Sequence, residues 1–420
     1  MSTKNLKKRR DAVAKMMDAG SVMILYSGKE VHVSEDEYYM FEVNKNFRYL
    51  TDIDRDNMVL FIDKTGKKVT ETLFIEEADP LMEKWYGKKL TKDEAKEISG
   101  IEDVRFIDSF DNMLARMLTT CCIKNAYFDL YHHDASDELD FNHKRAMEFH
   151  KKNPAVVLKN AYEIIGYLRM SKDADEVKRI SHAVDMTRQG LEAVMKELKP
   201  GMYEYQAQAI YEYTIHYLGS SGPSFPTIAG SGYNGTMLHY ETNRCECKDG
   251  DLLLLDLGSK ADGWCSDITR TYPVNGKFTK RQKDVYNVVL EANQHIAKIA
   301  KPGMTLRELN DECKKVLAKG AKKLGLIKED SELSKYYMHG VGHHLGLDVH
   351  DASTYEGVKL RPGCVITDEP GLYIDEECIG IRIEDDLLIT EDGCKVLSKD
   401  IIRKPDDIEA FMAKNKKGKK

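Results

Sequence analysis

The sequence predicts an α/β protein of two domains, and three observations support this prediction. The chain has 420 residues, enough for two or three domains. Residues 1–168 alternate short apolar segments with amphipathic stretches, whereas residues 169–408 contain an internal repeat. Hydrophobic residues make up 42% of the chain and charged residues 32%, an ordinary balance for a globular protein. We therefore expect an N-terminal α/β domain followed by a second domain of two pseudo-symmetric halves.

Four short apolar segments of the first domain predict strands, with helices between them. They are Ser21–Tyr26, Met58–Ile62, Thr72–Ile75 and Ala126–Leu130. The pattern changes near residue 168, where Ser171 and Asp173 are candidate N-caps for a long amphipathic helix that runs to about Leu198. This change predicts the domain boundary.

The second domain repeats both a turn and a carboxylate. Lys-Pro-Gly-Met follows one predicted helix and precedes another at residues 199–202, and again at residues 301–304. Asp256 lies six residues after Gly250 and Glu369 lies six residues after Gly363, each with a further glycine two residues on. Pro-Gly and Asp-x-Gly turns are common, but their shared order and spacing favour a duplication over coincidence. Two similar halves would then each deliver one carboxylate to a shared site.

Charge and cysteine usage narrow the functional classes. The net charge of −7 and the pI near 6.1 argue against a nucleic-acid-binding protein. No apolar run predicts a membrane span or a signal peptide, and nine irregularly spaced cysteines are typical of reduced thiols in the cytoplasm. Residues 409–420, rich in lysine, are expected to form a solvated basic tail.

Two aspartates flank a predicted hairpin. Asp256 ends the apolar run that begins at Leu252, and Asp267 follows eleven residues later in a second strand-like segment. A turn at residues 261–263 would bring both carboxylates together. Either aspartate alone would be interpreted as a turn or capping residue, but a carboxylate at the end of a buried strand needs compensation of its charge.

Histidines and further carboxylates are concentrated toward the C-terminus. Four of the thirteen histidines, among them His339, His343 and His350, fall within residues 339–350, beside three glycines. Such a segment favours a metal site or a substrate-polarising site. Arg382 and Glu384 are two residues apart in a strand-like stretch, so their side chains would share one face, and a simple salt bridge would also explain them.

The candidate ligands are two aspartates, two glutamates and one histidine. Four carboxylates that converge without cations would repel one another strongly, so the arrangement makes physical sense only around metal. Oxygen-rich ligation with one imidazole favours Mn²⁺ or a similar ion over a thiolate-type zinc site. We expect divalent ions, with Mn²⁺ preferred and Co²⁺ or Zn²⁺ as alternatives; the resemblance described next implies two of them.

These residues resemble the ligands of the pita-bread metallopeptidase family, which includes methionine aminopeptidase, prolidase and aminopeptidase P. The five positions, in the family's order, are Asp256, Asp267, His343, Glu369 and Glu384. The segments 238–240, 268–276 and 339–351 most resemble the aminopeptidase P branch, and so do residues 44–51 and 85–87 of the first domain. The resemblance thus covers nearly the whole chain and implies a creatinase-like N-terminal domain before a pita-bread catalytic domain.

The resemblance also implies a role for each site residue. Asp256 would bind one metal, Asp267 and Glu384 would bridge both metals, and His343 and Glu369 would complete the ligands of the second metal. Arg382 would orient a bridging carboxylate, and three histidines would contact the substrate and stabilise the reacting centre, namely His239, His339 and His350. Glu369 would accept the proton of a water shared by the metals and pass it to the leaving nitrogen.

The implied activity is removal of an N-terminal residue that precedes proline. Prolidase, which acts on Xaa-Pro dipeptides, remains the nearest alternative, because substrate length depends on loops and subunit packing. Methionine aminopeptidase fits less well because it lacks a long N-terminal domain. A non-catalytic pita-bread binding protein, or a metal-free creatinase, would be expected to lack several of the ligands. The family also implies a homodimer or homotetramer, in which Trp85 takes part in the subunit interface, although a core tryptophan is the alternative.

Overall fold

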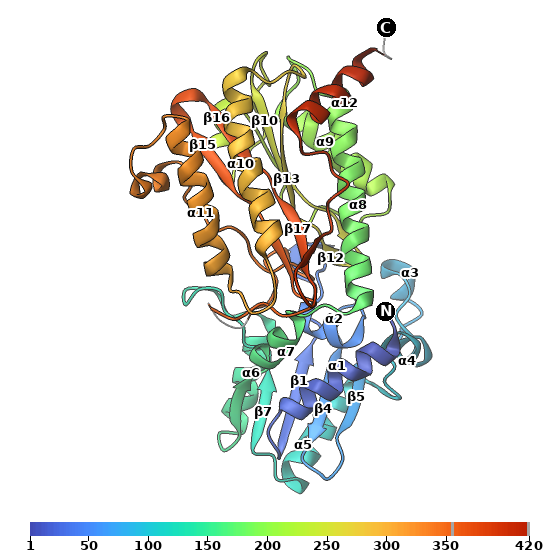
Figure 1. Ribbon diagram of the computed structural model, residues 1–420. Coiled ribbons are helices and arrows are strands. Elements are labelled where there is room, and N and C mark those ends of the chain that lie inside the picture. The colour runs from blue at the N-terminus through green and yellow to red at the C-terminus, as the bar shows by residue number, and fades with distance from the viewer. Residues whose placement is uncertain (354–356, 418–420) are drawn as a thin grey trace. The chain divides into compact units, whose positions relative to one another are not determined.

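The computed structural model describes residues 1–353 and 357–417. They form two compact units, Met1–Arg169 and Met170–Lys420, and each unit is described by itself (Figure 1). Among the described residues, no helix is both long enough and apolar enough to cross a membrane.

The first unit is built on a six-stranded mixed sheet of strand order β6-β5-β4-β1-β7-β8. Its strands are β1 (Ser21–Tyr26), β4 (Val59–Lys64), β5 (Thr70–Ile75), β6 (Asp103–Phe106), β7 (Asn125–Phe128) and β8 (Val157–Asn160). β1 pairs antiparallel with β4 and parallel with β7. All six residues of β1 are buried. A strand that is buried on both faces needs apolar side chains on both, which explains its nearly continuous apolar sequence.

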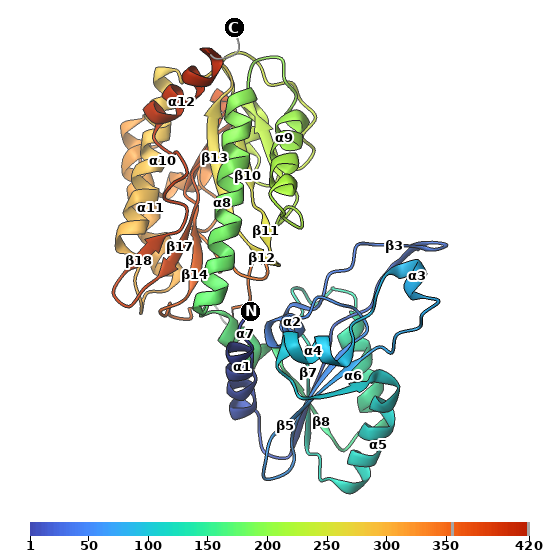
Figure 2. The same ribbon diagram turned by 90° about the vertical axis from the view of Figure 1, so that its right-hand side faces the viewer.

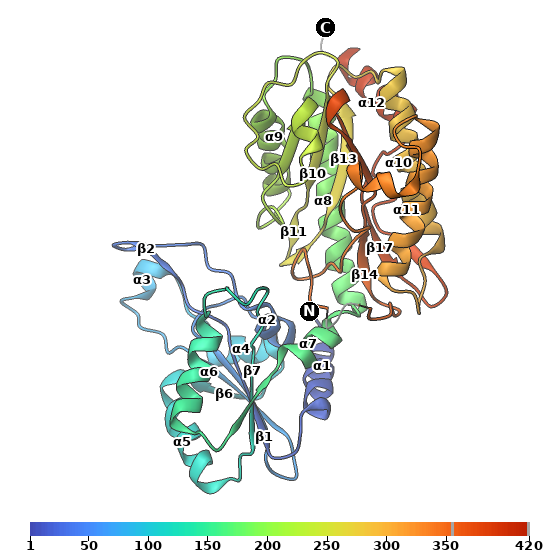
Figure 3. The same cartoon turned by 90° about the vertical axis from the view of Figure 1, so that its left-hand side faces the viewer.

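Helices cover both faces of this sheet, with α1 on one face and α5 and α6 on the other (Figure 3). The helices are α1 (Thr3–Met16), α2 (Lys45–Thr51), α3 (Glu83–Tyr86), α4 (Lys92–Ser99), α5 (Phe110–Thr120), α6 (Phe141–Lys152) and α7 (Tyr162–Arg169). A separate hairpin is formed by β2 (His32–Ser34) and β3 (Glu37–Tyr38). The four predicted strands of this domain are confirmed, with ends that differ from the prediction by at most two residues.

The second unit contains two helix pairs that lie on either side of its strands (Figure 2). The pairs are α8 (Ala174–Glu197) with α9 (Glu204–Tyr217), and α10 (Lys280–Ile299) with α11 (Leu306–Lys323). Asp173 immediately precedes α8, and its carboxylate accepts hydrogen bonds from the backbone N–H groups of Asp175 and Glu176. Asp173 is therefore the N-cap, and Ser171, the other candidate, is not.

The strands of the second unit form small antiparallel sheets. β9 (Ile228–Ser231), β10 (Leu252–Leu257) and β13 (Ile268–Pro273) make one sheet; β14 (Val365–Asp368), β17 (Asp385–Ile389) and β18 (Cys394–Val396) make another. Two hairpins complete the unit, β11 (Lys260–Ala261) with β12 (Trp264–Cys265), and β15 (Gly371–Ile374) with β16 (Ile379–Arg382).

The two Lys-Pro-Gly-Met turns have the same backbone geometry. Gly201 has φ +85° and its N–H donates to the carbonyl oxygen of Cys247 at 2.9 Å; Gly303 has φ +89° and its N–H donates to Leu360 at 2.9 Å. In each copy the accepting residue returns a bond of 2.7 Å to the methionine of the turn. The glycines are needed because other residues rarely adopt this φ. This matched geometry confirms the predicted internal repeat.

The hairpin predicted between the two aspartates is also confirmed. β10 pairs antiparallel with β13, and Asp256 lies opposite Thr269. Thr269 is only two residues after Asp267, so the pairing brings the two aspartates close together. The connection includes β11 and β12, with Asp262 and Gly263 both at positive φ. Such a turn matches the twist of the strands it joins.

The C-terminal segment differs from the prediction. Residues 409–417 belong to α12 (Pro405–Lys417), in which Ile408 and Met412 are completely buried. The expected boundary at residue 409 therefore falls inside a helix. The prediction followed the lysine-rich composition and overlooked the spacing of Ile408 and Met412. Residues four apart lie on one face of a helix, and here that face packs inward.

Candidate metal centre

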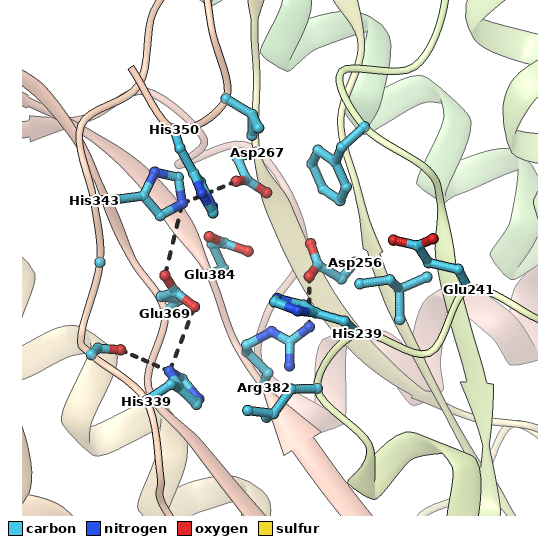
Figure 4. A pocket seen from close by; sticks show the side chains of 16 residues that line it. His239, Glu241, Asp256, Asp267, His339, His343, His350, Glu369, Arg382 and Glu384 are labelled. Atoms are coloured by element: carbon cyan, nitrogen blue, oxygen red, sulfur yellow. Dashed lines mark hydrogen bonds and ion pairs between the residues drawn. The ribbon is translucent and has the colours of Figure 1, made fainter. Parts of the chain in front are cut away.

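All the site residues predicted from the sequence line one cavity of about 440 Å³ in the second unit (Figure 4). The polar residues of its wall are His239, Glu241, Asp256, Asp267, His339, His343, His350, Glu369, Arg382 and Glu384. Apolar side chains of Phe225, Ile228, Leu238 and Val349 complete it. The cavity therefore gathers side chains from segments more than 150 residues apart in the chain.

The first two carboxylates come from the paired strands β10 and β13. Asp256 lies near the end of β10, and Asp267 immediately precedes β13. Gly258 lets the two strands approach closely, because a Cβ atom there would lie 1.8 Å from the carbonyl oxygen of Ser266. Asp267 is further held by its backbone N–H, which donates to the buried carboxylate of Asp386 at 3.3 Å.

His343 and Glu369 are placed by a strand-like pairing that involves β14. The backbone N–H of Thr367 donates to the carbonyl oxygen of His343 at 2.9 Å, and that of Glu369 donates to Val341 at 2.8 Å. Gly342 is required in this pairing, because a Cβ atom there would lie 2.1 Å from the carbonyl oxygen of Thr367. The segment therefore holds His343 beside Glu369.

Glu384 lies between strands rather than within one. β16 ends at Arg382 and β17 begins at Asp385, so the single continuous strand expected around residues 382–384 is wrong. The hydroxyl of Thr269 donates to Glu384 Oε2 at 2.6 Å, and the backbone N–H of Glu384 donates to the carbonyl oxygen of Thr269 at 3.1 Å. These two bonds fix Glu384 next to β13.

Three of the candidate ligands converge closely. One ligand atom from each of Asp267, His343 and Glu384 lies within 4.8 Å of the others. His343 Nε2 is 3.3 Å from Asp267 Oδ2 and 3.9 Å from Glu369 Oε1. The other ring nitrogen, Nδ1, is 3.0 Å from the carbonyl oxygen of His344, which orients Nε2 toward the carboxylates.

Arg382 is the one guanidinium in the wall of this cavity, as far as the described residues show. Its Nη2 donates to Asp256 Oδ2 at 2.6 Å and its Nη1 to the hydroxyl of Tyr373 at 2.9 Å. Its Nε donates to Thr269 at 3.0 Å, so it reaches Glu384 only through that hydroxyl. Arg382 thus contacts Asp256 directly and Glu384 through Thr269, and its role in orienting a bridging carboxylate stays a prediction.

Burial and mutual repulsion shift the carboxyl groups toward their protonated forms. The pKa of Asp267 and that of Glu384 are raised well above their usual values, first by burial and then by the neighbouring carboxylates. The pKa of Glu369 is raised to about 7, mainly by burial, with Arg382 acting against the shift. The pKa of His343 is lowered to about 4, mainly by burial, which keeps its imidazole neutral.

These properties fit a site for divalent cations. Asp256 Oδ1 and Asp267 Oδ1 are buried and have no hydrogen-bond partner among the described residues. Buried carboxylate oxygens without partners are costly, and bound cations would compensate both the lost hydration and the repulsion. Four carboxylates and one neutral imidazole form a donor set typical of Mn²⁺ and related ions.

The three remaining histidines surround this cluster. His339 Nε2 lies 2.8 Å from the hydroxyl of Tyr373, and its Nδ1 lies 3.7 Å from Glu369 Oε2. The ring of His350 lies 4.2 Å from that of His343, centroid to centroid. His239 and His350 are both exposed, so they reach the cavity from its open side.

Sequence reasoning missed the residues that connect the site, above all Thr269 and Tyr373. Thr269 links Arg382 to Glu384, and Tyr373 links Arg382 to His339. Their position in the strand-like segments beside the predicted carboxylates was the only available indication. Which of their neighbours they contact depends on the pairing of β13 with β10 and of β15 with β16.

Comparisons with known proteins agree with this geometry. A model of metallopeptidase family M24 matches residues 178–391, and a model of the aminopeptidase P N-terminal domain matches residues 6–125. The chain therefore belongs to metallopeptidase family M24. The predicted fold class, an N-terminal α/β domain before a pita-bread catalytic domain, is confirmed.

Within that family the similarity is to aminopeptidase P. The Xaa-Pro aminopeptidase of Escherichia coli K12 is 33% identical, with 99% of each chain covered. A solved structure described as a putative aminopeptidase P from Bacillus anthracis is 44% identical, with a TM-score of 0.97 and 99% of each chain covered. The structure of E. coli aminopeptidase P with the inhibitor Pro-Leu is 32% identical, with a TM-score of 0.89 over 99% of each chain. The resemblance expected from the motifs is confirmed.

The carboxylate cluster predicts a metal-dependent stability. We expect Mn²⁺ at about 100 times its dissociation constant to stabilise the metal-free protein by about 2.7 kcal/mol, which thermal unfolding would detect as a rise in Tm. Asp267→Asn should abolish most of this rise, and its metal-free form should be at least as stable as the wild type, because one repelling carboxylate is removed. Equal Tm rises in the two proteins would contradict the assignment of Asp267 to the metal site.

Proposed function

We propose that the protein is an Xaa-Pro aminopeptidase that depends on two divalent metal ions. The single observation that supports this most strongly is the convergence of all five candidate ligands and three non-ligand histidines on one cavity. The relatives that match nearly the whole chain are named Xaa-Pro aminopeptidases, which supports a preference for proline at the second position of the peptide. The substrates would thus be peptides with an N-terminal Xaa-Pro sequence.

The proposed ligands divide between two ions. Asp256 would bind one ion, Asp267 and Glu384 would bind both, and His343 and Glu369 would complete the second. The donor chemistry favours Mn²⁺, with Co²⁺ or Zn²⁺ as alternatives. Bound at this site, the ions would polarise the scissile carbonyl and lower the pKa of a water enough to supply hydroxide near neutral pH.

The protein side chains would carry the proton and orient the peptide. Glu369 would accept the proton of the attacking water and deliver it to the proline nitrogen that leaves. This role is supported by its position between His343 and His339. His239 or His350, on the open side of the cavity, would donate a hydrogen bond to the carbonyl oxygen as it gains negative charge. Arg382 would hold the Asp256 carboxylate in place through its hydrogen bond.

The proposed activity is tested with two substrates. The purified protein would be stripped of metal and assayed for release of the first residue from an Xaa-Pro-Pro tripeptide and from an Xaa-Pro dipeptide, with and without Mn²⁺. We expect cleavage of the tripeptide that requires metal. Cleavage of the dipeptide alone would identify a prolidase instead, and cleavage of neither would contradict the proposed function.

Substitution of Glu369 tests its proposed role in proton transfer. Glu369→Gln keeps the size of the side chain and one oxygen ligand but removes the base, so kcat should fall by a factor of about 10² to 10⁴. Glu391→Gln, at an exposed carboxylate in the turn before β18, is the matched control and should retain wild-type kcat. Normal turnover of the Glu369→Gln protein, once metal content is shown to equal that of the wild type, would refute the assignment.

We also propose that the chain forms a homodimer or homotetramer through its first unit. Large apolar side chains are exposed on and near the β2–β3 hairpin and α3, including Val31 (62% exposed), Met40 (88%), Leu81 (64%) and Trp85 (75%). Trp85 is therefore not a core residue. A concentration of apolar side chains of this kind is typical of protein interfaces, and aromatic residues are enriched there.

The oligomer is tested by sedimentation velocity on the wild type and on Trp85→Glu. A charge placed in the middle of an apolar interface should shift the protein toward monomers. Lys67→Glu, a charge change on an exposed residue between β4 and β5, is the control and should leave the distribution as in the wild type. A wild-type protein that sediments as a monomer at all concentrations would rule the interface out.

A cytoplasmic location is the last part of the proposal. None of the nine cysteines, all of which lie among the described residues, forms a disulfide bond, and Cys247 and Cys313 are buried. Free thiols persist in reducing compartments, which supports this location.

A further inference from the structure

One wall of the cavity is formed by the segment between the 3₁₀ helix η2 (Gly232–Thr236) and β10. This segment, residues 237–251, contributes Leu238, His239 and Glu241 to the cavity. Glu241 is the carboxylate of the cavity wall that belongs to neither the proposed ligand set nor the proposed proton transfer. Its role is therefore open.

The backbone around Glu241 is held in place by a buried glutamate. Glu204, the first residue of α9, is completely buried, and its carboxylate accepts four hydrogen bonds. The donors are the backbone N–H groups of Ser231 and Cys245, both at 2.8 Å, and the side chains of Asn234 and Tyr240, both at 2.9 Å. Tyr240 immediately precedes Glu241, so one side of this position is fixed.

The other side of Glu241 is fixed by Asn243. This asparagine has φ +50° and is 1% exposed. Its amide nitrogen donates to the carbonyl oxygen of Thr227 at 2.7 Å and to Gln208 at 3.0 Å, and its oxygen accepts from the backbone of Ala229 at 3.0 Å. Anchors on both sides hold the backbone of Glu241 in one place, which reduces the entropic cost of binding a ligand there.

The side chain of Glu241 itself is available. Across residues 1–353 and 357–415 its carboxylate makes no hydrogen bond or ion pair. Arg244, a basic neighbour in the same segment, lies over the ring of Tyr205 at 5.6 Å. The surrounding wall is apolar, with Phe225, Ile228 and Leu238. An unpaired carboxylate beside an apolar wall suits a ligand that has an aliphatic stem and a cationic end.

The position of Glu241 indicates which part of the peptide it meets. In Figure 4 its carboxylate lies on the Asp256 side of the cavity, whereas Glu369 and His339 lie on the opposite side. In the proposed reaction Glu369 delivers a proton to the proline nitrogen, so the proline occupies the Glu369 side. The N-terminal residue of the peptide then occupies the side of Asp256 and Glu241.

Within that residue, the side chain and not the α-amino group matches Glu241. The α-amino nitrogen is two bonds from the scissile carbonyl carbon, so it must remain near the buried metal ligands, where the carboxylate of Asp256 is only 13% exposed. Glu241 is exposed at the rim, a place that only the far end of a long side chain would reach.

We propose that Glu241 is a specificity-determining residue that favours peptides whose N-terminal residue is arginine or lysine. The stem of that side chain would lie along Phe225, Ile228 and Leu238, and its cation would pair with the Glu241 carboxylate. This inference rests on the proposed aminopeptidase function and narrows its substrates to basic-Pro peptides. An exposed ion pair is weakened by salt, so the preference should decline as ionic strength rises.

The test compares Arg-Pro-Pro with Met-Pro-Pro, which have N-terminal side chains of similar reach and different charge. With the Mn²⁺-loaded full-length enzyme, we expect kcat/KM to favour the arginine peptide roughly tenfold, equivalent to about 1.4 kcal/mol. Glu241→Gln should reduce that ratio to near one, and Glu241→Lys should reverse it. Glu246→Gln, at an exposed glutamate of the same segment outside the cavity wall, is the matched control and should keep the wild-type ratio.

The outcomes separate this inference from the function on which it rests. Cleavage of both peptides by the wild type with a ratio near one would overturn the role of Glu241 and leave the aminopeptidase in place. An equal loss for both peptides in Glu241→Gln would also overturn it, since that result would indicate contact with the shared α-amino group or a structural role. Cleavage of neither peptide by the wild type would overturn the proposed function itself.

Discussion

The crowding of four carboxylates into one cavity is the constraint on which the rest of the second unit depends. Asp256, Asp267, Glu369 and Glu384 lie on separate segments, and each must be held against repulsion from the others. Arg382 compensates one of them directly, through Asp256. One guanidinium cannot balance four carboxylates, so the protein positions negative charge that cations would neutralise. Rigid backbone around each ligand is the physical requirement, because a side chain free to move would relax away from its neighbours.

The duplicated scaffold supplies that rigidity. Each half places a carboxylate near the end of a strand, Asp256 on β10 and Glu369 after β14. Earlier in each half lies a Lys-Pro-Gly-Met turn, and the two turns make nearly identical hydrogen bonds. Close contacts then set the spacing between segments, at Gly258 against Ser266 and at Gly342 against Thr367. No side chain fits at either position, so the ligands are brought together by backbone packing. Because the two halves of the second unit repeat the same structure, segments far apart in the sequence reach one cavity.

Around this fixed centre, the variable part of the site is the segment of residues 237–251. Its backbone is anchored through Glu204 and Asn243, but His239 and Glu241 project from it into the open side of the cavity. An anchored backbone with exposed side chains separates two tasks. The candidate metal ligands would provide the chemistry shared by the family, while side chains at the rim of the cavity would determine which peptides bind. A change at the rim would then alter recognition without disturbing the packing beneath it.

The sequence alone determined the fold class, the internal repeat and the five candidate ligands, because each depends on local patterns. The apolar strand that ends at Asp256, the glycines beside His343 and the equal spacing of Gly250 and Gly363 are all visible along the chain. Only the tertiary structure decided that Arg382 binds Asp256, that Thr269 and Tyr373 connect the site, that residues 409–417 form part of a helix, and that Glu241 faces the cavity. Strand register, loop anchoring and helix packing control these contacts, and they involve residues far apart in the sequence, so no local pattern encodes them.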